Sequence, residues 1–381
     1  MKKILFITGT RAEYGLMKPI LRAIQHDAHL SLSLVVTGMH LSPEFGLSIK
    51  EIEKDCFSIC ARLPLLHTED TLKGMAKYLG KLIFHLSETV QQEKPDILLS
   101  IGDRDEALAG ACIGSHLNIP VVHLHGGERT GTLDESMRHA ITKMSHVHCC
   151  ATQQSKKRIL KLGEEPWRVH VVGAPGLDMI RKKEFPKKEK IRETFHLNSN
   201  KPTLLVIQHP VTTEIESAES QMRETMEAIK SLGHQTIVIY PNADAGGRRM
   251  IKVIEGYKHL PFIQCHKTIS HSNYLGLLGT VNAIVGNSSS ALIETPPFHL
   301  PAINIGSRQY LRERSTNVID VPHHQDKIKK AIEKALFDKK FKSIVKKCKS
   351  VYGDGKTAEK VVKILKSVQK DKHTVQKRMT Y

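Results

Sequence analysis

The sequence lacks any apolar run long enough to cross a bilayer, and its seven cysteines include no Cys-x-x-Cys spacing. We therefore expect no membrane-spanning segment, and neither a zinc knuckle nor a disulfide framework is indicated. The phosphate-binding patterns Gly-x-x-x-x-Gly-Lys-Ser/Thr and Gly-x-Gly-x-x-Gly are missing as well, which disfavours triphosphate cleavage and dinucleotide binding. Aromatic residues make up only 5% of the chain, with a single tryptophan, so platforms for stacking nucleic-acid bases are scarce.

Negative charge is also in short supply, because the formal net charge is +18. From Pro322 onward there are 18 Lys and Arg residues against six Asp and Glu residues, so most of the excess lies near the C-terminus. These lysines are spread around predicted amphipathic helices without interleaved aromatic rings, which favours a solvated basic surface over a nucleic-acid groove. We expect neither a nucleic acid nor a membrane as a partner. The remaining positive charge suits an anionic small molecule.

The chain of 381 residues exceeds the roughly 250–300 at which a single core stops growing, so two domains are expected. The apolar run at residues 4–7 is too short for a secretion signal. It meets Thr8-Gly9-Thr10, which predicts a buried first strand followed by a loop. This start of the chain indicates a cytoplasmic protein.

Short β-branched runs alternate with helix-length amphipathic stretches, a pattern typical of parallel sheets covered by helices on both faces. The predicted strands cover residues 4–7, 32–36, 96–100, 121–124 and 169–172 in the first half, and 204–207, 236–240, 283–285, 302–305 and 318–321 in the second. A Lys-rich stretch around residues 181–190 separates the two series and is typical of a linker. The sequence thus predicts an α/β protein with two Rossmann-like domains. We place the N-terminal domain at residues 1–178, the C-terminal nucleotide-binding domain at 179–355, and a helix crossing back to the N-terminal domain, then a basic tail, at 356–381.

Glycine, arginine, histidine and carboxylates recur directly after the predicted strands of both halves. Ligands of open parallel sheets bind outside the carboxyl ends of the strands, so these residues are candidates for one site. The loop with Ser288 and Ser289 precedes a helical segment, where N–H groups and hydroxyls can hold an anion; a simple helix N-cap is the alternative. Arg11 and Arg308 carry the planar fork that suits a pyrophosphate. Glu294 can accept hydrogen bonds from a ribose diol or can simply favour the start of its helix.

The candidate acid/base groups at the strand exits are Asp103, Asp105, Glu106, His125, Glu128, Asp134 and His209. Carboxylates in a dry cleft between domains can have separated pKa values, so that one accepts a proton while another donates it. Each of these groups alone could be solvated or structural, and only the set indicates function. His139, His146 and His148 form a histidine-rich stretch, but their spacing fits no known ligand pattern, so no metal site is predicted.

Several of these motifs occur together along the chain: Thr8-Gly9-Thr10-Arg11-Ala12-Glu13-Tyr14, Gly102-Asp103-Arg104, His125-Gly126-Gly127-Glu128, Arg138-His139-Ala140-Ile141-Thr142-Lys143, Gln208-His209-Pro210-Val211-Thr212, Pro241-Asn242-Ala243-Asp244-Ala245-Gly246, Gly286-Asn287-Ser288-Ser289 and Asn304-Ile305-Gly306-Ser307-Arg308-Gln309. As a set they resemble the hydrolysing UDP-N-acetylglucosamine 2-epimerases that open sialic-acid pathways. The likeness runs in one register from about Lys2 to about Gly355. No single motif would be specific, whereas the ordered set is.

The resemblance implies a GT-B-type fold with the ligand cleft between two domains, and a two-step reaction without a metal or redox cofactor. In the first step a base removes the proton at C2 of the sugar while UDP leaves C1, which gives a glycal. Water then adds at C1 and a proton returns to the opposite face of C2, so that N-acetylmannosamine and UDP are released. The substrate is a UDP-linked sugar, and we also expect a homo-oligomer, either a dimer or a tetramer.

Roles can be carried over residue by residue from the resemblance. The implied acid/base residues are Asp103, Glu128, Asp134 and His209. The implied substrate-binding residues are Arg11, Ser288, Ser289 and Arg308 for the diphosphate, Glu294 for the ribose, and Asn242 and Arg104 for the sugar side of the cleft. General acid–base help and a charge-compensated leaving diphosphate are each worth several powers of ten in rate, so these residue types fit the chemistry.

One position departs from the pattern of many relatives. They carry Glu-Gly-Gly-Glu where this chain has His125-Gly126-Gly127-Glu128, so an imidazole replaces a catalytic carboxylate and the role of His125 is open. The His form and the Glu294-Thr295-Pro296-Pro297-Phe298 stretch also resemble the branch acting on UDP- or GDP-linked 2,4-diacetamido-2,4,6-trideoxyhexoses. Two further alternatives stay open: a non-hydrolysing epimerase, and a glycosyltransferase on the same scaffold, because a fold alone does not fix function.

Overall fold

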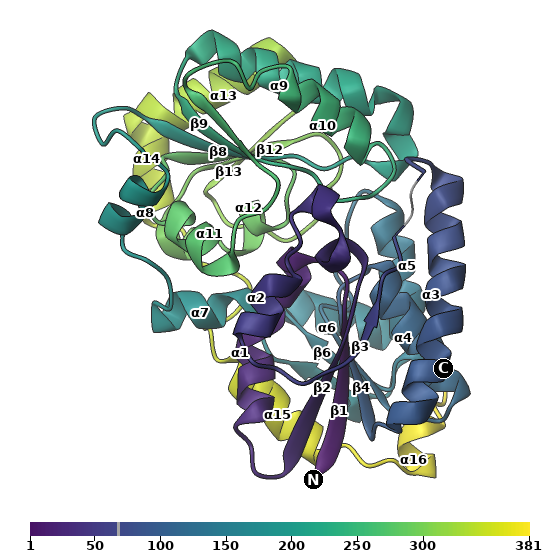
Figure 1. Ribbon diagram of the computed structural model, residues 1–381. Coiled ribbons are helices and arrows are strands. Elements are labelled where there is room, and N and C mark those ends of the chain that lie inside the picture. The colour runs from purple at the N-terminus through teal and green to yellow at the C-terminus, as the bar shows by residue number, and fades with distance from the viewer. Residues whose placement is uncertain (67–68) are drawn as a thin grey trace.

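Two parallel β-sheets, one in each half of the chain, organise the computed structural model, which describes residues 1–66 and 69–381 (Figure 1). The first sheet has the strand order β3-β2-β1-β4-β5-β6-β7 and the second the order β10-β9-β8-β11-β12-β13. The strands of the first sheet are β1 (Lys2–Thr8), β2 (Leu30–Thr37), β3 (Ile59–Leu63), β4 (Ile97–Ile101), β5 (Val121–Leu124), β6 (Val147–Cys150) and β7 (Val169–Val171). Those of the second are β8 (Thr203–Ile207), β9 (Gln235–Ile239), β10 (Ile263–His266), β11 (Ala283–Gly286), β12 (Ala302–Ile305) and β13 (Val318–Val321).

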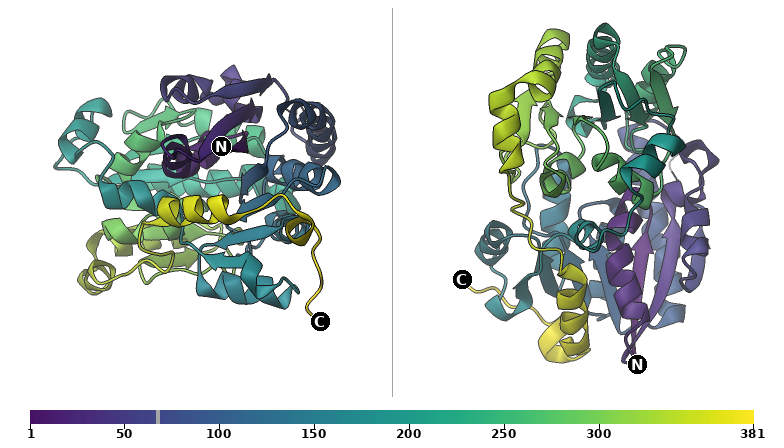
Figure 2. Two further views of the ribbon diagram at one scale, coloured as in Figure 1. Left: turned by 90° about the horizontal axis from the view of Figure 1, so that it is seen from below. Right: turned by 90° about the vertical axis from the view of Figure 1, so that its left-hand side faces the viewer.

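Helices cover both faces of each sheet, as Figures 1 and 2 show. In the first lobe they are α1 (Arg11–Gln25), α2 (Ile49–Lys54), α3 (Leu72–Glu93), α4 (Asp105–His116), α5 (Leu133–Met144) and α6 (Gln153–Lys161). Helices α7 (Gly176–Lys182) and α8 (Lys188–Thr194) lead into the second lobe, which contains α9 (Ala218–Leu232), α10 (Gly247–Glu255), α11 (His271–Leu278), α12 (Ser290–Ile293), α13 (Gln325–Phe337) and α14 (Lys339–Lys346). The chain ends with α15 (Thr357–Ser367) and α16 (Lys372–Val375). This confirms the expected α/β architecture of two Rossmann-like halves, of the GT-B type.

The central strands are apolar because they are buried on both faces, as parallel strands usually are. In β1, Ile4 lies opposite Leu32 of β2 and Ile97 of β4, and all the strand residues after Lys3 are buried. Helix α1 begins immediately after the strand exit, since the Thr10 side chain accepts a hydrogen bond from the backbone N–H of Glu13. The tight join between strand and helix brings the first residues of α1 to the carboxyl edge of the sheet.

Each of the ten predicted strands overlaps a strand of the structure, and β3, β6 and β10 lie outside those ten. Strands β3 and β10 lie at the edges of their sheets and are only partly buried, so their sequences mix polar and apolar residues. Strand β6 is fully buried but reads Val-His-Cys-Cys, without a β-branched run. Burial of histidine and cysteine here is a tertiary effect that β-propensity cannot detect.

The C-terminal segment returns to the first lobe. Figure 2 shows it descending from the second lobe, and α15 packs against α1 and α7. The N-terminus of α15 is capped by Asp178, whose carboxylate accepts the backbone N–H groups of Thr357 at 2.9 Å and Ala358 at 2.7 Å. The boundary that we place at residue 178 falls within α7.

The final residues are held against the first lobe rather than extended into solvent. Lys377, with 15% of its side chain exposed, donates to the backbone oxygens of Thr142, Lys143 and Ser145 at the C-terminal end of α5. It also pairs with the buried carboxylate of Glu164 at 2.7 Å. Lys377 is thus not part of the solvated basic surface that the sequence favours, because carbonyls at a helix C-terminus attract a cation.

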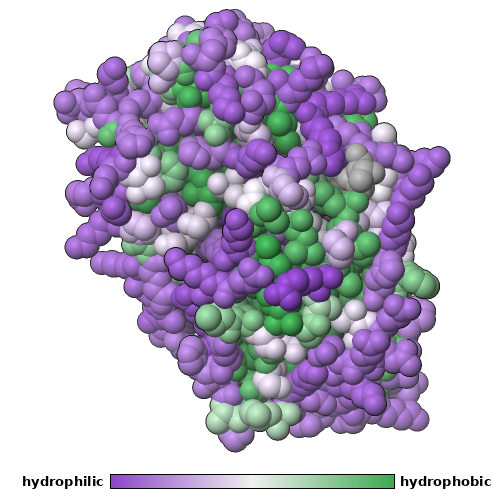
Figure 3. Space-filling view, viewed as in Figure 1, coloured by the Kyte–Doolittle hydropathy of each residue, from purple (hydrophilic) through white to green (hydrophobic). Residues whose placement is uncertain are grey.

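Hydrophilic residues cover most of the face drawn in Figure 3, with hydrophobic residues gathered near its middle. Within residues 1–66 and 69–381, no helix is both long and apolar enough to span a bilayer. The carboxyl ends of the two sheets meet at the junction of the lobes, where the largest groups of charged and polar loop residues come together.

Candidate active site

A cavity of about 250 Å³ lies between the two lobes at the strand exits. It is lined from the first lobe by residues following β1, β4 and β5 and by α5, and from the second by residues following β8, β9, β11 and β12. Eleven of the fourteen candidate residues line it: Arg11, Asp103, Arg104, His125, Asp134, His209, Asn242, Ser288, Ser289, Glu294 and Arg308. Glu128 does not line the cavity, and neither do Asp105 and Glu106. The structure thus brings residues as far apart in the sequence as Arg11 and Arg308 to one cavity.

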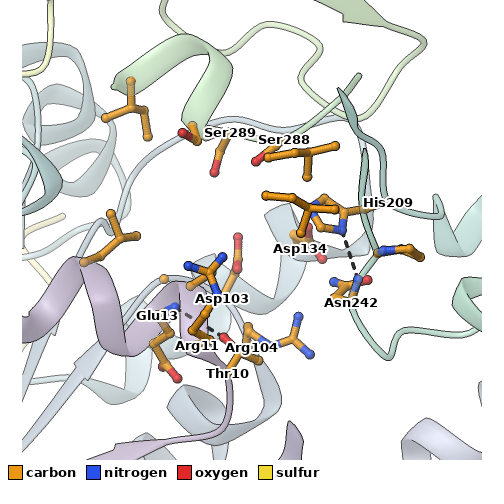
Figure 4. Close-up of a pocket in the computed structure, with 18 of the residues that line it drawn as sticks. Thr10, Arg11, Glu13, Asp103, Arg104, Asp134, His209, Asn242, Ser288 and Ser289 are labelled. Atoms are coloured by element: carbon orange, nitrogen blue, oxygen red, sulfur yellow. Dashed lines mark hydrogen bonds between the residues drawn. The ribbon is translucent and has the colours of Figure 1, made fainter. Parts of the chain in front are cut away.

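One side of the cavity carries hydroxyls and cations. Figure 4 shows Ser288 and Ser289 projecting from the loop before α12, across from Arg11. The Nη1 of Arg11 is buried and has no hydrogen-bond partner, and burial lowers the pKa of this guanidinium. A buried cation without a partner costs folding free energy unless an anion pairs with it. Helix α12 is only four residues long, so hydroxyls, N–H groups and Arg11 offer more to an anion than its dipole does.

Arg308 stands on the second-lobe side of the same region. It donates to the backbone oxygen of Asn287 at 3.3 Å and reaches Asp134 Oδ2 at 3.4 Å. Glu294 is 3% exposed, and its carboxylate lies 3.4 Å from Nε2 of His271. A carboxylate held in this way at the cavity wall can accept hydrogen bonds from a neutral diol.

The opposite side carries the candidate proton-transfer groups. Asp103 pairs with Arg138, which is almost fully buried and also donates to the backbone oxygen of Glu128 at 3.2 Å. Asp134, in the first turn of α5, lies between this pair and Arg308. Asp103 and Asp134 therefore each contact a guanidinium at the cavity, Arg138 and Arg308 respectively.

The tautomer of His209 follows from its backbone partner. The N–H of Asn242 donates to Nδ1 of His209 at 3.1 Å, as Figure 4 shows. Because Nδ1 accepts, the neutral ring carries its proton on Nε2. Burial lowers the pKa of His209 to about 3, so the ring is neutral at pH 7. His209 can therefore donate a hydrogen bond into the cavity.

Asp244 was quoted as part of a motif but was not predicted as a site residue. It accepts from Arg104 at 3.0 Å and from the side chain of Asn242 at 2.5 Å. Although burial opposes both charges, Asp244 and Glu106 raise the pKa of Arg104, and Arg104 lowers the pKa of Asp244. Asp244 thus fixes the two side chains that were expected on the sugar side.

Three other lining residues were missed: Glu13 and Arg138 lie in helices, where charges usually face solvent, and Arg312 lies in the loop between β12 and β13. Glu13 lines the cavity, and burial together with the nearby Glu106 raises its pKa to about 8. Arg138 and Arg312 also line the cavity. Glu13 and Arg138 occurred in quoted motifs but were given no role, and Arg312 occurred in none of them.

Both lobes are needed to complete the cavity. Three ion pairs cross between them at its walls: Arg104–Asp244, Asp134–Arg308 and Glu128–Arg312. Gly131 makes the approach possible, since a Cβ there would lie 2.0 Å from the backbone oxygen of Ser307. Its N–H donates to the backbone oxygen of Arg308 at 3.1 Å. Neither lobe alone presents the full set of charged groups.

His125 and Glu128 form a pair at the end of β5. The Nδ1 of His125 lies 2.5 Å from Oε1 of Glu128, and the other carboxylate oxygen of Glu128 accepts from Arg312. Glu128 is 2% exposed and lies behind the imidazole. Burial alone would raise the pKa of Glu128, but Arg312 and His125 lower this pKa to about 2.

Comparison with known proteins agrees with this geometry. A family model described as UDP-N-acetylglucosamine 2-epimerase matches residues 22–366. The chain is 40% identical over 368 residues to a UDP-N,N'-diacetylbacillosamine 2-epimerase (hydrolyzing) of Legionella pneumophila, covering 97% of this chain and 96% of that one. It is 34% identical over 343 residues to a UDP-N-acetylglucosamine 2-epimerase of Neisseria meningitidis, covering 90% of each.

Solved structures show the same fold. The crystal structure of UDP-GlcNAc 2-epimerase from Neisseria meningitidis bound to UDP-GlcNAc superposes with a TM-score of 0.80 at 18% identity, covering 96% of this chain and 100% of that one. That of the Methanocaldococcus jannaschii UDP-GlcNAc 2-epimerase in complex with UDP-GlcNAc and UDP gives 0.79 at 22% identity, with the same coverage.

Proposed function

The chain belongs to the hydrolysing UDP-N-acetylglucosamine 2-epimerase family, and we propose that it cleaves a UDP-linked 2-acetamido sugar with inversion at C2, releasing UDP and the free epimeric sugar. The observation that carries this proposal is an interlobe cavity in which the unpartnered Nη1 of Arg11 and two serine hydroxyls face carboxylates and imidazoles. Cations suit the leaving diphosphate, while carboxylates and imidazoles suit proton removal and return at the neighbouring carbon.

The diphosphate is assigned to the side with Arg11, Ser288, Ser289 and Arg308. The buried, unpartnered Nη1 of Arg11 supports this assignment, because a phosphate oxygen would satisfy it. Placing the leaving group among cations stabilises the negative charge that develops as the bond from C1 breaks. Glu294 would then accept hydrogen bonds from the ribose.

The sugar is assigned to the side with Asp103, Asp134, His209 and Asn242. Asp103 and Asp134 are the carboxylate candidates for exchanging a proton at C2. His209, with its Nε2–H free to donate, would orient or polarise an oxygen of the sugar rather than remove a proton. Arg104 would support Asn242 through Asp244.

For the sugar itself, we infer a 2,4-diacetamido-2,4,6-trideoxyhexose, with N-acetylglucosamine as the second candidate. The higher identity to the Legionella pneumophila enzyme, 40% against 34% for the Neisseria meningitidis enzyme, supports this order. The released sugar would enter the synthesis of a sialic-type, nonulosonic acid.

The test is to incubate the protein separately with UDP-N-acetylglucosamine and UDP-N,N'-diacetylbacillosamine in deuterated water. Release of UDP, a free sugar with inverted C2 and deuterium at C2 are expected for at least one substrate. No UDP from either substrate would refute the proposal. A UDP-linked epimer would indicate a non-hydrolysing epimerase, and release that depends on an added acceptor would indicate a glycosyltransferase.

A further inference from the structure

The imidazole of His125 lines the interlobe cavity, and its contact with Glu128 gives the ring a defined tautomer. We propose, on the basis of the function proposed above, that His125 is the group that accepts the proton from C2, while Glu128 and Arg312 are positioning residues that hold its ring. Glu128, although it resembles an acid/base residue in the sequence, would then act only through His125.

The first argument is the tautomer of His125. An ionised carboxylate can only accept hydrogen bonds, so the 2.5 Å contact with Glu128 requires the proton of the neutral ring to be on Nδ1. The lone pair is then on Nε2, at the opposite edge of the ring. This Nε2 is buried without a hydrogen-bond partner, and His125 lines the cavity. A buried imidazole nitrogen without a partner at a cavity wall is available to a ligand.

The second argument is that Glu128 has no free acceptor for the substrate. One oxygen is taken by His125 and the other by Arg312, and the residue does not line the cavity. The competing carboxylate Asp103 is paired with Arg138. Oδ2 of Asp103 is thus already occupied by a guanidinium, whereas Nε2 of His125 has no partner.

The third argument is that the backbone holds His125 in a specific and costly conformation. Its φ is +60°, a strained region that residues with a Cβ seldom occupy. The following Gly127 packs closely, since a Cβ there would lie 2.4 Å from the backbone oxygen of Ser155. The turn after β5 is therefore fixed by its neighbours, and it aims the ring at one place.

Two of the three histidines that line the cavity, His125 and His209, have opposite tautomers. His125 presents a lone pair from the first lobe, and His209 presents an N–H from the second. One can accept a proton while the other donates a hydrogen bond. Since Arg312 belongs to the second lobe, the base would be correctly held only when the lobes are together.

The proton balance is as follows. The C2–H electron pair becomes the C1=C2 double bond, the C1–O pair leaves with the diphosphate, and the proton goes to Nε2 of His125. In the hydration step the acid form of Asp103 or Asp134 protonates C2 on the face opposite His125, water bonds to C1, and the proton lost by that water restores the acid form. The imidazolium of His125 releases its proton to solvent, so UDP leaves together with one proton.

The tautomer can be tested without a substrate. Protein labelled with ¹⁵N in its histidines is compared with the His125→Gln variant to assign the His125 ring nitrogens by NMR. We expect a protonated Nδ1 and an unprotonated Nε2 in the wild-type protein. An Nε2 that carries the proton would overturn the proposal, whatever the reaction of the enzyme.

Kinetics then separates a positioning role from a structural one. His125→Gln and Glu128→Gln should each lower kcat by about a hundredfold or more with UDP affinity within about threefold, because both remove the correctly placed lone pair. Glu128→Asp should restore part of kcat. The matched control is Glu164→Gln, since Glu164 is also buried and pairs with a histidine, His148 at 3.1 Å, away from the cavity. It should reduce the melting temperature with kcat nearly unchanged.

The outcomes distinguish this inference from the proposed function. A wild-type protein that releases no UDP from either amino-sugar nucleotide fails the proposed function, and the NMR result still decides the tautomer. If the wild type is active and His125→Gln keeps kcat within threefold, the role of His125 is refuted. If Glu128→Gln lowers the melting temperature and UDP affinity as strongly as kcat, Glu128 serves only to join the lobes through Arg312, and its role as a positioning residue is refuted.

Discussion

Replacement of Asp178 tests how the returning C-terminal helix is attached. Asp178 is 2% exposed, and its two oxygens accept the first N–H groups of α15. In Asp178→Ala both buried N–H groups lose their acceptor, which costs about 1–3 kcal/mol each. Burial raises the pKa of Asp178 in spite of these bonds, which shows that burying its charge is itself unfavourable. Removing that charge therefore offsets part of the free energy lost with the two hydrogen bonds. We expect a net loss of about 3 kcal/mol.

The conservative variant Asp178→Asn tests whether the loss comes from the two capping hydrogen bonds. In Asp178→Asn the amide oxygen can still satisfy one N–H, and no charge is buried, so we expect a loss of only about 1 kcal/mol. Because two lobes need not unfold in one step, the measurement should be local: hydrogen exchange in the peptide covering α15. A loss of 3 kcal/mol corresponds to exchange faster by about 150-fold.

A control at the other end of α15 distinguishes capping from general contact. Asp27→Asn removes the ion pair with Lys366, whose side chain is 42% exposed, and should change exchange in α15 little. The reasoning would be wrong if Asp178→Ala left exchange in α15 unchanged, or if Asp178→Asn were as damaging as Asp178→Ala.

Three further outcomes are expected. Asp103→Asn should keep UDP affinity within about tenfold and lower turnover about a hundredfold in the UDP-release assay; equal losses of both would make Asp103 structural. Gly131→Ala should lower turnover about a hundredfold by holding the lobes apart, with small-angle scattering showing a more open molecule; unchanged kinetics would contradict this. Burial lowers the pKa of His40 and His123 to about 3 and of His148 to about 4, so the unfolded chain takes up more protons below pH 6.5. Stability should be lost as the pH falls from 6.5 towards 4, by up to about 1.4 kcal/mol per pH unit for each histidine, and a flat melting temperature there would refute this.

The sequence alone was enough for the two series of strands and for the loops that follow them. Apolar runs such as Leu204–Ile207 must be buried on both faces, and a parallel sheet gathers its carboxyl ends at one edge. Arg11, Asp103, His209 and Ser288 could therefore be assigned to one cleft without knowing any distance. Their roles, in contrast, came from a resemblance.

Only the tertiary structure decided which groups are paired. Glu128 and Asp103 look alike in the sequence, yet one lies behind an imidazole and the other at the cavity wall. Arg312 and Asp178 gave no signal, because each acts on an element more than a hundred residues away. Strand period and residue type are local properties of a chain, whereas burial, tautomer and ion pairing depend on neighbours that folding brings from elsewhere. The sequence could therefore locate the cleft, but not say which nitrogen within it carries a proton.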